Sequence, residues 1–287
     1  DLHLLSRRQR QMCIRDRVAD ISNEEEKGSR LSLLGAFYGI GALGIPVLLS
    51  FLSEHYSFEI ILQGTGAVML AGILFCVCVR FPAPKQPQGF PIKEGLGLLK
   101  KSSLLLLSFI LFFQSGIEGV CNNWTTLYLG QTTGIPENRA LMALTCMVAG
   151  LTVARLLLVV LFKKIRQETV LRTSLITASL GFALLTFSPG FARAAVGMVL
   201  IGTGLASTFP VILSVIGSRY ASLSGTAFSV ALVIALIGQT LLNSLTGIIS
   251  QGYGIAVYPY MMIVSLLIML LPVSYTHLRA HETLANL

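Results

Sequence analysis

The sequence predicts an all-α, polytopic membrane protein with about eight transmembrane helices. Of its 287 residues, 54% are hydrophobic and 12% are charged, whereas soluble domains carry about a quarter charged residues. The mean hydropathy is +0.76. Apolar runs recur that are long enough, at about 1.5 Å per residue, to cross a hydrocarbon layer of roughly 30 Å as helices. These observations exclude a soluble globular domain.

Short loops containing Gly, Pro, Asn or Ser separate most of the runs, so neighbouring helices are expected to pack antiparallel. The predicted spans are residues 31–53, 58–80, 103–129, 139–162, 168–188, 191–217, 222–249 and 254–272. The exception is residues 81–102, where prolines and lysines indicate a linker. The chain therefore divides into two helices ending one bundle (18–80), a linker (81–102) and a bundle of six helices (103–272).

The two ends do not resemble parts of this fold. Residues 1–17 and 273–287 contain RRQRQMCIRDR and SYTHLRAHET, strings typical of translated sequencing-adapter read-through. We exclude both tails from the fold prediction, as for an expression scar. The alternative is a native basic tail that binds anionic lipid. If the tails are artefacts, we expect the natural protein to extend upstream and to supply four more spans.

The net charge of +8 is spread over loops and helix ends and does not gather on one face. Residues 80–101 and the two loops on the same predicted side hold ten Lys or Arg, and the alternate loops hold two. This bias places the linker on the cytoplasmic side. We therefore expect no nucleic-acid partner. Because the cysteines and histidines show no ligand or triad spacing, we predict no catalytic set, metal site or cofactor.

The run 103–129 carries the strongest functional signal. Gln114, Glu118 and Asn122 recur at i, i+4 and i+8, so this apolar helix has one polar face. A carboxylate near the middle of a membrane costs at least several kcal/mol unless it is compensated. We therefore expect Glu118 to face a cavity or a partner, and we predict that the three residues contact a solute.

Further polar residues extend the predicted solute site. Asn123 follows Asn122, and Gln239 and Asn243 give the run 222–249 a polar face of its own. Trp124 is expected either to stack on a ligand or to lie in an aromatic belt at the membrane interface. Pro210 lacks a backbone donor and should kink the run 191–217.

Arg155 is the second intramembrane charge. Its predicted depth differs from that of Glu118 by about 10 Å, at 1.5 Å per residue. Two roles remain open: Arg155 pairs with Glu118, or it braces a gate nearer the cytoplasm.

Residues 39–44, GIGALG, match the dinucleotide fingerprint G-x-G-x-x-G. The match lies within an apolar helix and follows no strand, which argues against cofactor binding. Glycines in such a helix instead allow close approach of a neighbour, and a proline allows a bend. The predicted packing and kink residues are Gly35, Gly39, Gly41, Gly44 and Pro46.

Several segments resemble one family of transporters. They are GAFYGIGALGIP at 35–46, GIEGVCNNWTTLY at 116–128, GLTVARLLLVVLFKKIR at 150–166, GTGLASTFPVI at 202–212 and SGTAFSVALVIALIGQ at 224–239. The chain resembles the major facilitator superfamily, and within it the fucose/glucose/galactose-proton symporters of bacteria. Ala154 departs from the family pattern, which has glycine there.

The resemblance implies that the spans are helices 5 to 12 of a major facilitator fold, and that solute binds between two six-helix halves that alternate in access. In that family, proton coupling is assigned mainly to acidic residues of the first half.

We therefore predict a fragment of a permease for a small polar solute, with a sugar as the solute and the proton as the coupling ion. We expect a monomer in the lipid bilayer of a bacterial inner membrane. The alternatives are a drug or metabolite efflux transporter of the same superfamily, an intramembrane enzyme and a non-functional truncated fragment.

Overall fold

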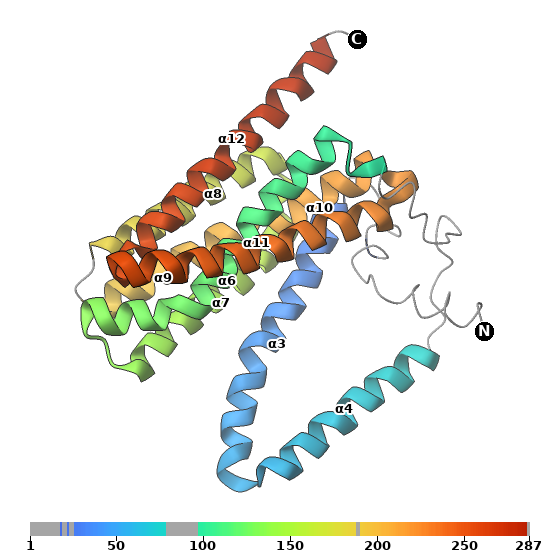
Figure 1. Cartoon of the computed structure of the whole chain (residues 1–287). Coiled ribbons are helices and arrows are strands. Elements are labelled where there is room, and N and C mark those ends of the chain that lie inside the picture. Colours follow the sequence, from blue (N-terminus) through green and yellow to red (C-terminus); the bar gives the residue numbers. More distant parts are fainter. Residues whose placement is uncertain (1–17, 19–21, 23–25, 79–96, 188–189, 286–287) are drawn as a thin grey trace.

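The computed structural model describes residues 18, 22, 26–78, 97–187 and 190–285, and the described elements are all helices (Figure 1). Two long helices come first, followed by the helices of a bundle. The α-helices are α3 (Lys27–His55), α4 (Phe58–Cys78), α6 (Ser102–Thr133), α7 (Glu137–Leu161), α8 (Gln167–Thr186), α9 (Phe191–Leu205), α10 (Thr208–Arg219), α11 (Ser224–Tyr253) and α12 (Tyr258–Ala285). The short 3₁₀ helices are η1 (Ala221–Leu223) and η2 (Ile255–Val257).

The all-α prediction is confirmed. Six helical segments of the described chain have the length and apolar composition needed to cross a membrane: α6, α7, α8, α9 with α10, α11 and Ile255–Val273. A shorter apolar stretch, Glu59–Phe75, lies in α4. The predicted N-terminal tail, 1–17, and most of the predicted linker lie outside the described residues.

The predicted span 191–217 is divided into two helices. Helix α9 ends at Leu205 and α10 begins at Thr208. Pro210 has no N–H to donate to the carbonyl of Ala206, so the helical hydrogen-bond pattern is interrupted at this turn. At the same turn, the N–H of Ala206 bonds to the carbonyl of Thr203, 3.4 Å away. This bond spans three residues, whereas an α-helical bond spans four, so the turn is tighter than in an α-helix. The break lies inside the bundle.

The last predicted span, 254–272, matches the apolar segment Ile255–Val273, and the helix that contains it extends further. Helix α12 continues to Ala285 with Pro272 inside it, and Figure 1 shows it running beyond the bundle. Residues 276–285, THLRAHETLA, contain several strong helix formers. One proline removes one backbone hydrogen bond, which the flanking turns tolerate here.

Helix α6 is the centre of the bundle. Its C-terminus is set by Gly134, whose left-handed φ of 65° turns the chain toward α7. Tyr128 donates a hydrogen bond to the Leu185 carbonyl on α8 at 3.1 Å. The hydroxyls of Thr125 and Tyr258 are 3.0 Å apart, which joins α6 to α12. These buried contacts fix the rotation of α6, and with it the direction of its polar side chains.

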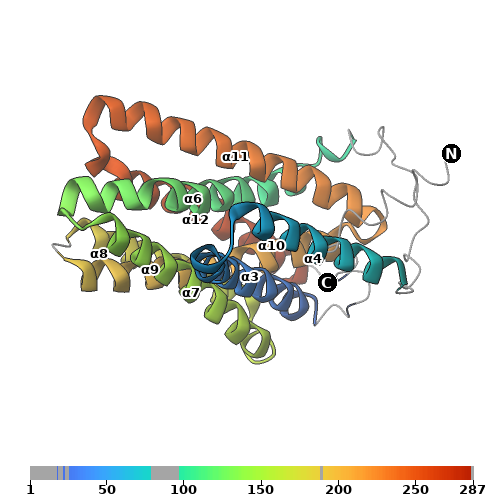
Figure 2. The same cartoon turned by 90° about the horizontal axis from the view of Figure 1, so that it is seen from below.

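Helix α4 and the second half of α3 stand apart from the other helices. The first half of α3 packs on α7 and α10, and its second half leaves the bundle before α4 turns back (Figures 1 and 2). On α4, eight large apolar side chains are exposed by 58% or more: Leu62, Val68, Met69, Leu70, Ile73, Leu74, Phe75 and Val77. Such a surface needs lipid or further helices to cover it.

Candidate functional site

A pocket lies between α6 and α11 near their C-terminal halves. Its volume is about 520 Å³, within the range of about 300–1,000 Å³ that small-molecule sites occupy. The lining residues are Asn123, Trp124, Leu127, Asn243, Ser244 and Gly247. Three of these six, Asn123, Trp124 and Asn243, belong to the predicted solute site.

Asn243 connects the polar groups of this pocket. Its Oδ1 accepts hydrogen bonds from Asn123 Nδ2 at 2.9 Å and from Trp124 Nε1 at 3.2 Å. Its Nδ2 donates to the Gln239 carbonyl, one turn earlier on α11, at 2.7 Å. Both ends of the amide are therefore engaged, and the side chains of α6 and α11 are held in one geometry. The exposed Asn123 retains its amide oxygen for a solute hydroxyl.

The indole of Trp124 forms one wall of the pocket. It is half-buried, and a Cβ added to Gly247 on α11 would lie 3.5 Å from the six-membered part of the ring. The single hydrogen-bond donor of the indole already faces Asn243. An apolar ring face beside amides is the combination that can contact both the C–H face and the hydroxyls of a small polar solute.

Glycines bring α6 and α11 close enough to form the pocket. A Cβ at Gly238 would lie 2.2 Å from the Phe112 carbonyl oxygen, and a Cβ at Gly119 would lie 2.6 Å from Gln239 Cγ. Gly116 faces Gly238 and Leu242 in the same way. Sequence reasoning missed these glycines. The signal that could have found them is the small-residue spacing of 116 and 119 on a helix with a polar neighbour.

The predicted residues Glu118, Asn122 and Gln239 lie beside this pocket and do not line it. Glu118 is half-buried, and Asn122 is exposed with its Nδ2 donating to the Glu118 carbonyl of its own helix at 2.9 Å. Gln239 is half-buried, with its Oε1 3.5 Å from Ser115 Oγ. Gln239 adjoins the pocket through its carbonyl, which accepts from Asn243; Glu118 and Asn122 stay predicted members of the site.

Gln114 is fully buried, and its Nε2 donates to the Leu205 carbonyl at the end of α9, 3.0 Å away. It is nine residues from Asn123, which at 100° per residue places the two side chains on opposite sides of α6. The i, i+4, i+8 pattern therefore does not describe one surface of the pocket.

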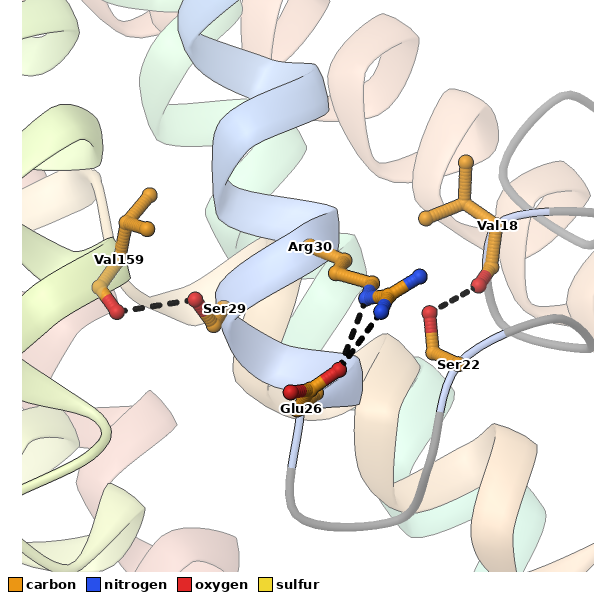
Figure 3. Close-up of polar contacts among 6 residues, drawn as sticks. All are labelled: Val18, Ser22, Glu26, Ser29, Arg30 and Val159. Carbon is orange, nitrogen blue, oxygen red and sulfur yellow. Dashed lines mark hydrogen bonds and ion pairs between the residues drawn. The ribbon is translucent and has the colours of Figure 1, made fainter.

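Arg155 lies at the seam between α7 and α3. It is 6% exposed, and its Nη1 donates to the Gly35 carbonyl on α3 at 3.2 Å. Ser32 donates to the Arg155 carbonyl at 2.7 Å, and Ser29 to the Val159 carbonyl at 2.9 Å. Figure 3 shows the Ser29 contact at the start of α3, next to the exposed Arg30 and Glu26 ion pair. This guanidinium contact thus joins α7 to α3, and pairing of Arg155 with Glu118 stays a prediction.

Of the predicted packing glycines, two are at this seam. A Cβ at Gly39 would lie 2.1 Å from Thr152 Oγ1, and one at Gly35 would lie 2.9 Å from Arg155 Cδ. Gly41 and Gly44 have no atom within 4 Å of an added Cβ, because this part of α3 has left the bundle. Pro46 lies within α3, which continues to His55. The close approach therefore needs Gly35 and Gly39 alone.

Replacing Arg155 by methionine should lower the free energy of unfolding by about 1–3 kcal/mol, because the Gly35 carbonyl would lose its charged donor inside the protein. The measurement is the midpoint of thermal unfolding in one detergent. Arg172→Met is the control, since Arg172 is exposed on α8. Equal midpoints for the two variants would show that the guanidinium does not stabilise the seam.

A bundle of apolar, membrane-length helices with a polar pocket between two of them defines a multi-pass membrane protein. The sequence model of the Major Facilitator Superfamily matches residues 17–242. The chain therefore belongs to the major facilitator superfamily.

Two curated bacterial relatives are similar in sequence. The uncharacterized MFS-type transporter YfkL of Bacillus subtilis is 24% identical over 241 residues, which are 80% of this chain and 60% of YfkL. The uncharacterized transporter y4wD of Sinorhizobium fredii is 25% identical over 159 residues, which are 55% of this chain and 42% of y4wD. The chain thus spans about 60% or less of the lengths of these relatives.

The fold is similar to that of the fucose:proton symporter FucP of E. coli. The TM-score is 0.74 at 17% sequence identity, covering 91% of this chain and 71% of the symporter chain. At this identity the likeness shows the fold alone. It confirms the predicted architecture of a major facilitator protein resembling the fucose symporter.

Proposed function

We propose that this chain is the solute-binding part of a secondary transporter for a hydroxyl-rich small molecule, with a sugar as the solute. The observation that carries the proposal is the pocket in which Asn243 holds Asn123 and Trp124 together across α6 and α11. Fixed amides beside an aromatic face suit a pyranose, which presents hydroxyls at its edge and C–H groups on its faces. Fucose, the solute in the name of the structural neighbour, agrees with this chemistry.

The pocket needs a second wall for transport by alternating access. Major facilitator proteins place the solute between two helical halves near mid-membrane. We infer that α3 and α4 are the last two helices of the first half, that residues 81–102 are a cytoplasmic linker, and that α6 to α12 are the second half. The exposed apolar surface of α4 supports this division, because further helices or lipid must cover it.

We propose proton coupling and a bacterial inner membrane as the setting, with a monomer as the working unit. Glu118 lies on α6, in the half of the transporter that contains the pocket, and it is half-buried one turn from Asn122. It is our candidate for binding a proton or a solute hydroxyl. The bacterial relatives support the membrane assignment.

Trp124 makes the proposal directly testable, because it is the single tryptophan of the chain. Titrating the purified chain with L-fucose, D-galactose or D-glucose should change the emission of Trp124 in a saturable way. We expect weak binding, with a Kd of about 1 mM or above, because one half of a two-sided site makes fewer contacts. A linear response to every sugar would overturn the proposed solute class.

The matched variants for this titration are Asn243→Ala and Thr240→Val, both on α11. Asn243→Ala removes the acceptor that holds Asn123 and Trp124, so the saturable change should be lost. Thr240 is exposed and its hydroxyl donates to the Leu236 carbonyl of its own helix, so Thr240→Val should titrate as the wild type does. Saturation that survives in Asn243→Ala would place sugar binding elsewhere.

A further inference from the structure

Three buried oxygen atoms belong to residues that lie at, or contact, the interruption between α9 and α10. They are Gln114 Oε1, Ser207 Oγ and Thr208 Oγ1, and none of them has a hydrogen-bond partner among the described residues. All three residues are 0% exposed. Buried polar side chains without partners are rare, and each calls for an explanation such as a bound ion, an ordered water or a functional role.

The orientation of Gln114 is fixed by the same break. Its Nε2 donates to the Leu205 carbonyl at 3.0 Å, and a carbonyl can only accept, so the amide cannot be reversed. The amide oxygen is therefore held away from Leu205 with its lone pairs available. Ser207 and Thr208 follow Leu205 by two and three residues, so their hydroxyls belong to the same turn of chain.

The hydroxyls of Ser207 and Thr208 differ from most others in this protein. Serines and threonines within its regular helices donate to the carbonyl four residues earlier, as Thr246 does at 2.7 Å and Thr152 at 2.8 Å. Ser207 and Thr208 lie at the interruption between α9 and α10, where neither hydroxyl has such an acceptor. The two oxygens are consequently left for another ligand.

The electrostatics of the break favour a cation. The C-terminal end of α9 carries the negative end of its helix dipole, and interrupted helices in transporters use such ends and unwound carbonyls to hold monovalent ions. Glu118 lies one turn beyond Gln114 on α6 and brings a negative charge to the same face. The oxygens themselves are neutral, whereas Ca²⁺ and Mg²⁺ prefer carboxylates and transition metals prefer nitrogen or sulfur.

We propose that Gln114, Ser207 and Thr208 form a binding site for a monovalent cation, with Na⁺ as the ion, at the break between α9 and α10. The site is separate from the sugar pocket, since Gln114 and Asn123 are on opposite sides of α6. Binding there joins α6 to both half-helices. It can be measured whether or not any sugar binds, so it does not depend on the proposed solute.

The test compares thermal unfolding of the purified chain in NaCl, KCl and choline chloride at one ionic strength. With Na⁺ at about ten times its Kd, the midpoint should rise by about 3–5 °C over choline. Thr208→Val, which keeps the shape and removes the oxygen, should abolish this difference. Thr246→Val is the control, because Thr246 is equally buried on α11 and bonds only within its own helix; it should keep the Na⁺ effect.

Equal midpoints in all three salts for the wild type would overturn the proposal. A Thr208→Val variant that is more stable than the wild type by the same amount in every salt would also overturn it, since the oxygens would then hold water or nothing. Equilibrium binding of radioactive Na⁺ to membranes containing each variant gives a second measurement that does not require unfolding. Loss of bound Na⁺ in Gln114→Leu and Thr208→Val, with binding retained in Thr246→Val, is the expected result.

Discussion

Replacing Gly238 by alanine should destabilise the bundle more than other single-methyl additions on α11. The new Cβ would lie 2.2 Å from the Phe112 carbonyl oxygen, and backbone atoms of α6 cannot rotate away as a flexible side chain can. The two helices must separate, which costs about 1–3 kcal/mol in a packed interior and more where backbone is displaced. The thermal midpoint in detergent should fall by several degrees.

The same substitution should also disturb the pocket. If α6 and α11 separate, Asn243 can no longer reach both Asn123 and Trp124, and the emission of Trp124 should shift as its indole loses its acceptor. The control is Gly252→Ala on the same helix, where no atom lies within 4 Å of the added Cβ. That variant should be unchanged or slightly more stable, since alanine favours a helix by about 1 kcal/mol over glycine. Equal stability of the two variants would contradict the close approach at Gly238.

Changing Glu118 to glutamine should lower uptake of labelled L-fucose by about tenfold or more, or leave uptake that no longer moves protons with it. Glutamine keeps the size and the hydrogen-bonding ability of the side chain, but it carries no charge and cannot take up a proton. The assay measures uptake by the protein in cells with and without a proton gradient.

The matched control is Glu137→Gln, because Glu137 is exposed at the start of α7 and lies away from the pocket. Wild-type uptake and coupling in Glu118→Gln would remove Glu118 from the mechanism. Sugar-dependent quenching of Trp124 can be measured on the same variant, so that loss of binding is separated from loss of coupling.

The sequence determined the class of the protein and the position of its helices. Membrane-length apolar runs predict helices because, in lipid, a single segment can hydrogen-bond all of its own backbone N–H and C=O groups only as a helix. The run 103–129 became α6 and the run 222–249 became α11, each extended by a few residues. The last helix continues beyond its predicted span, since a proline and polar residues stop a membrane span without ending a helix.

The sequence also identified Asn123, Trp124 and Asn243 as candidates, since amides and an indole stand out against apolar neighbours. It could not show that these three residues share one pocket and that Gln114 lies outside it. Periodicity gives the face of one helix on which a residue lies, but it does not give the neighbouring helix that this face contacts. Gln114 meets the broken end of α9, and Arg155 meets Gly35 on α3. The glycines at 116, 119 and 238 decide how closely α6 and α11 approach. Only the tertiary structure shows these pairings, since a contact between helices depends on their separation and rotation, which the periodicity of a single helix does not contain.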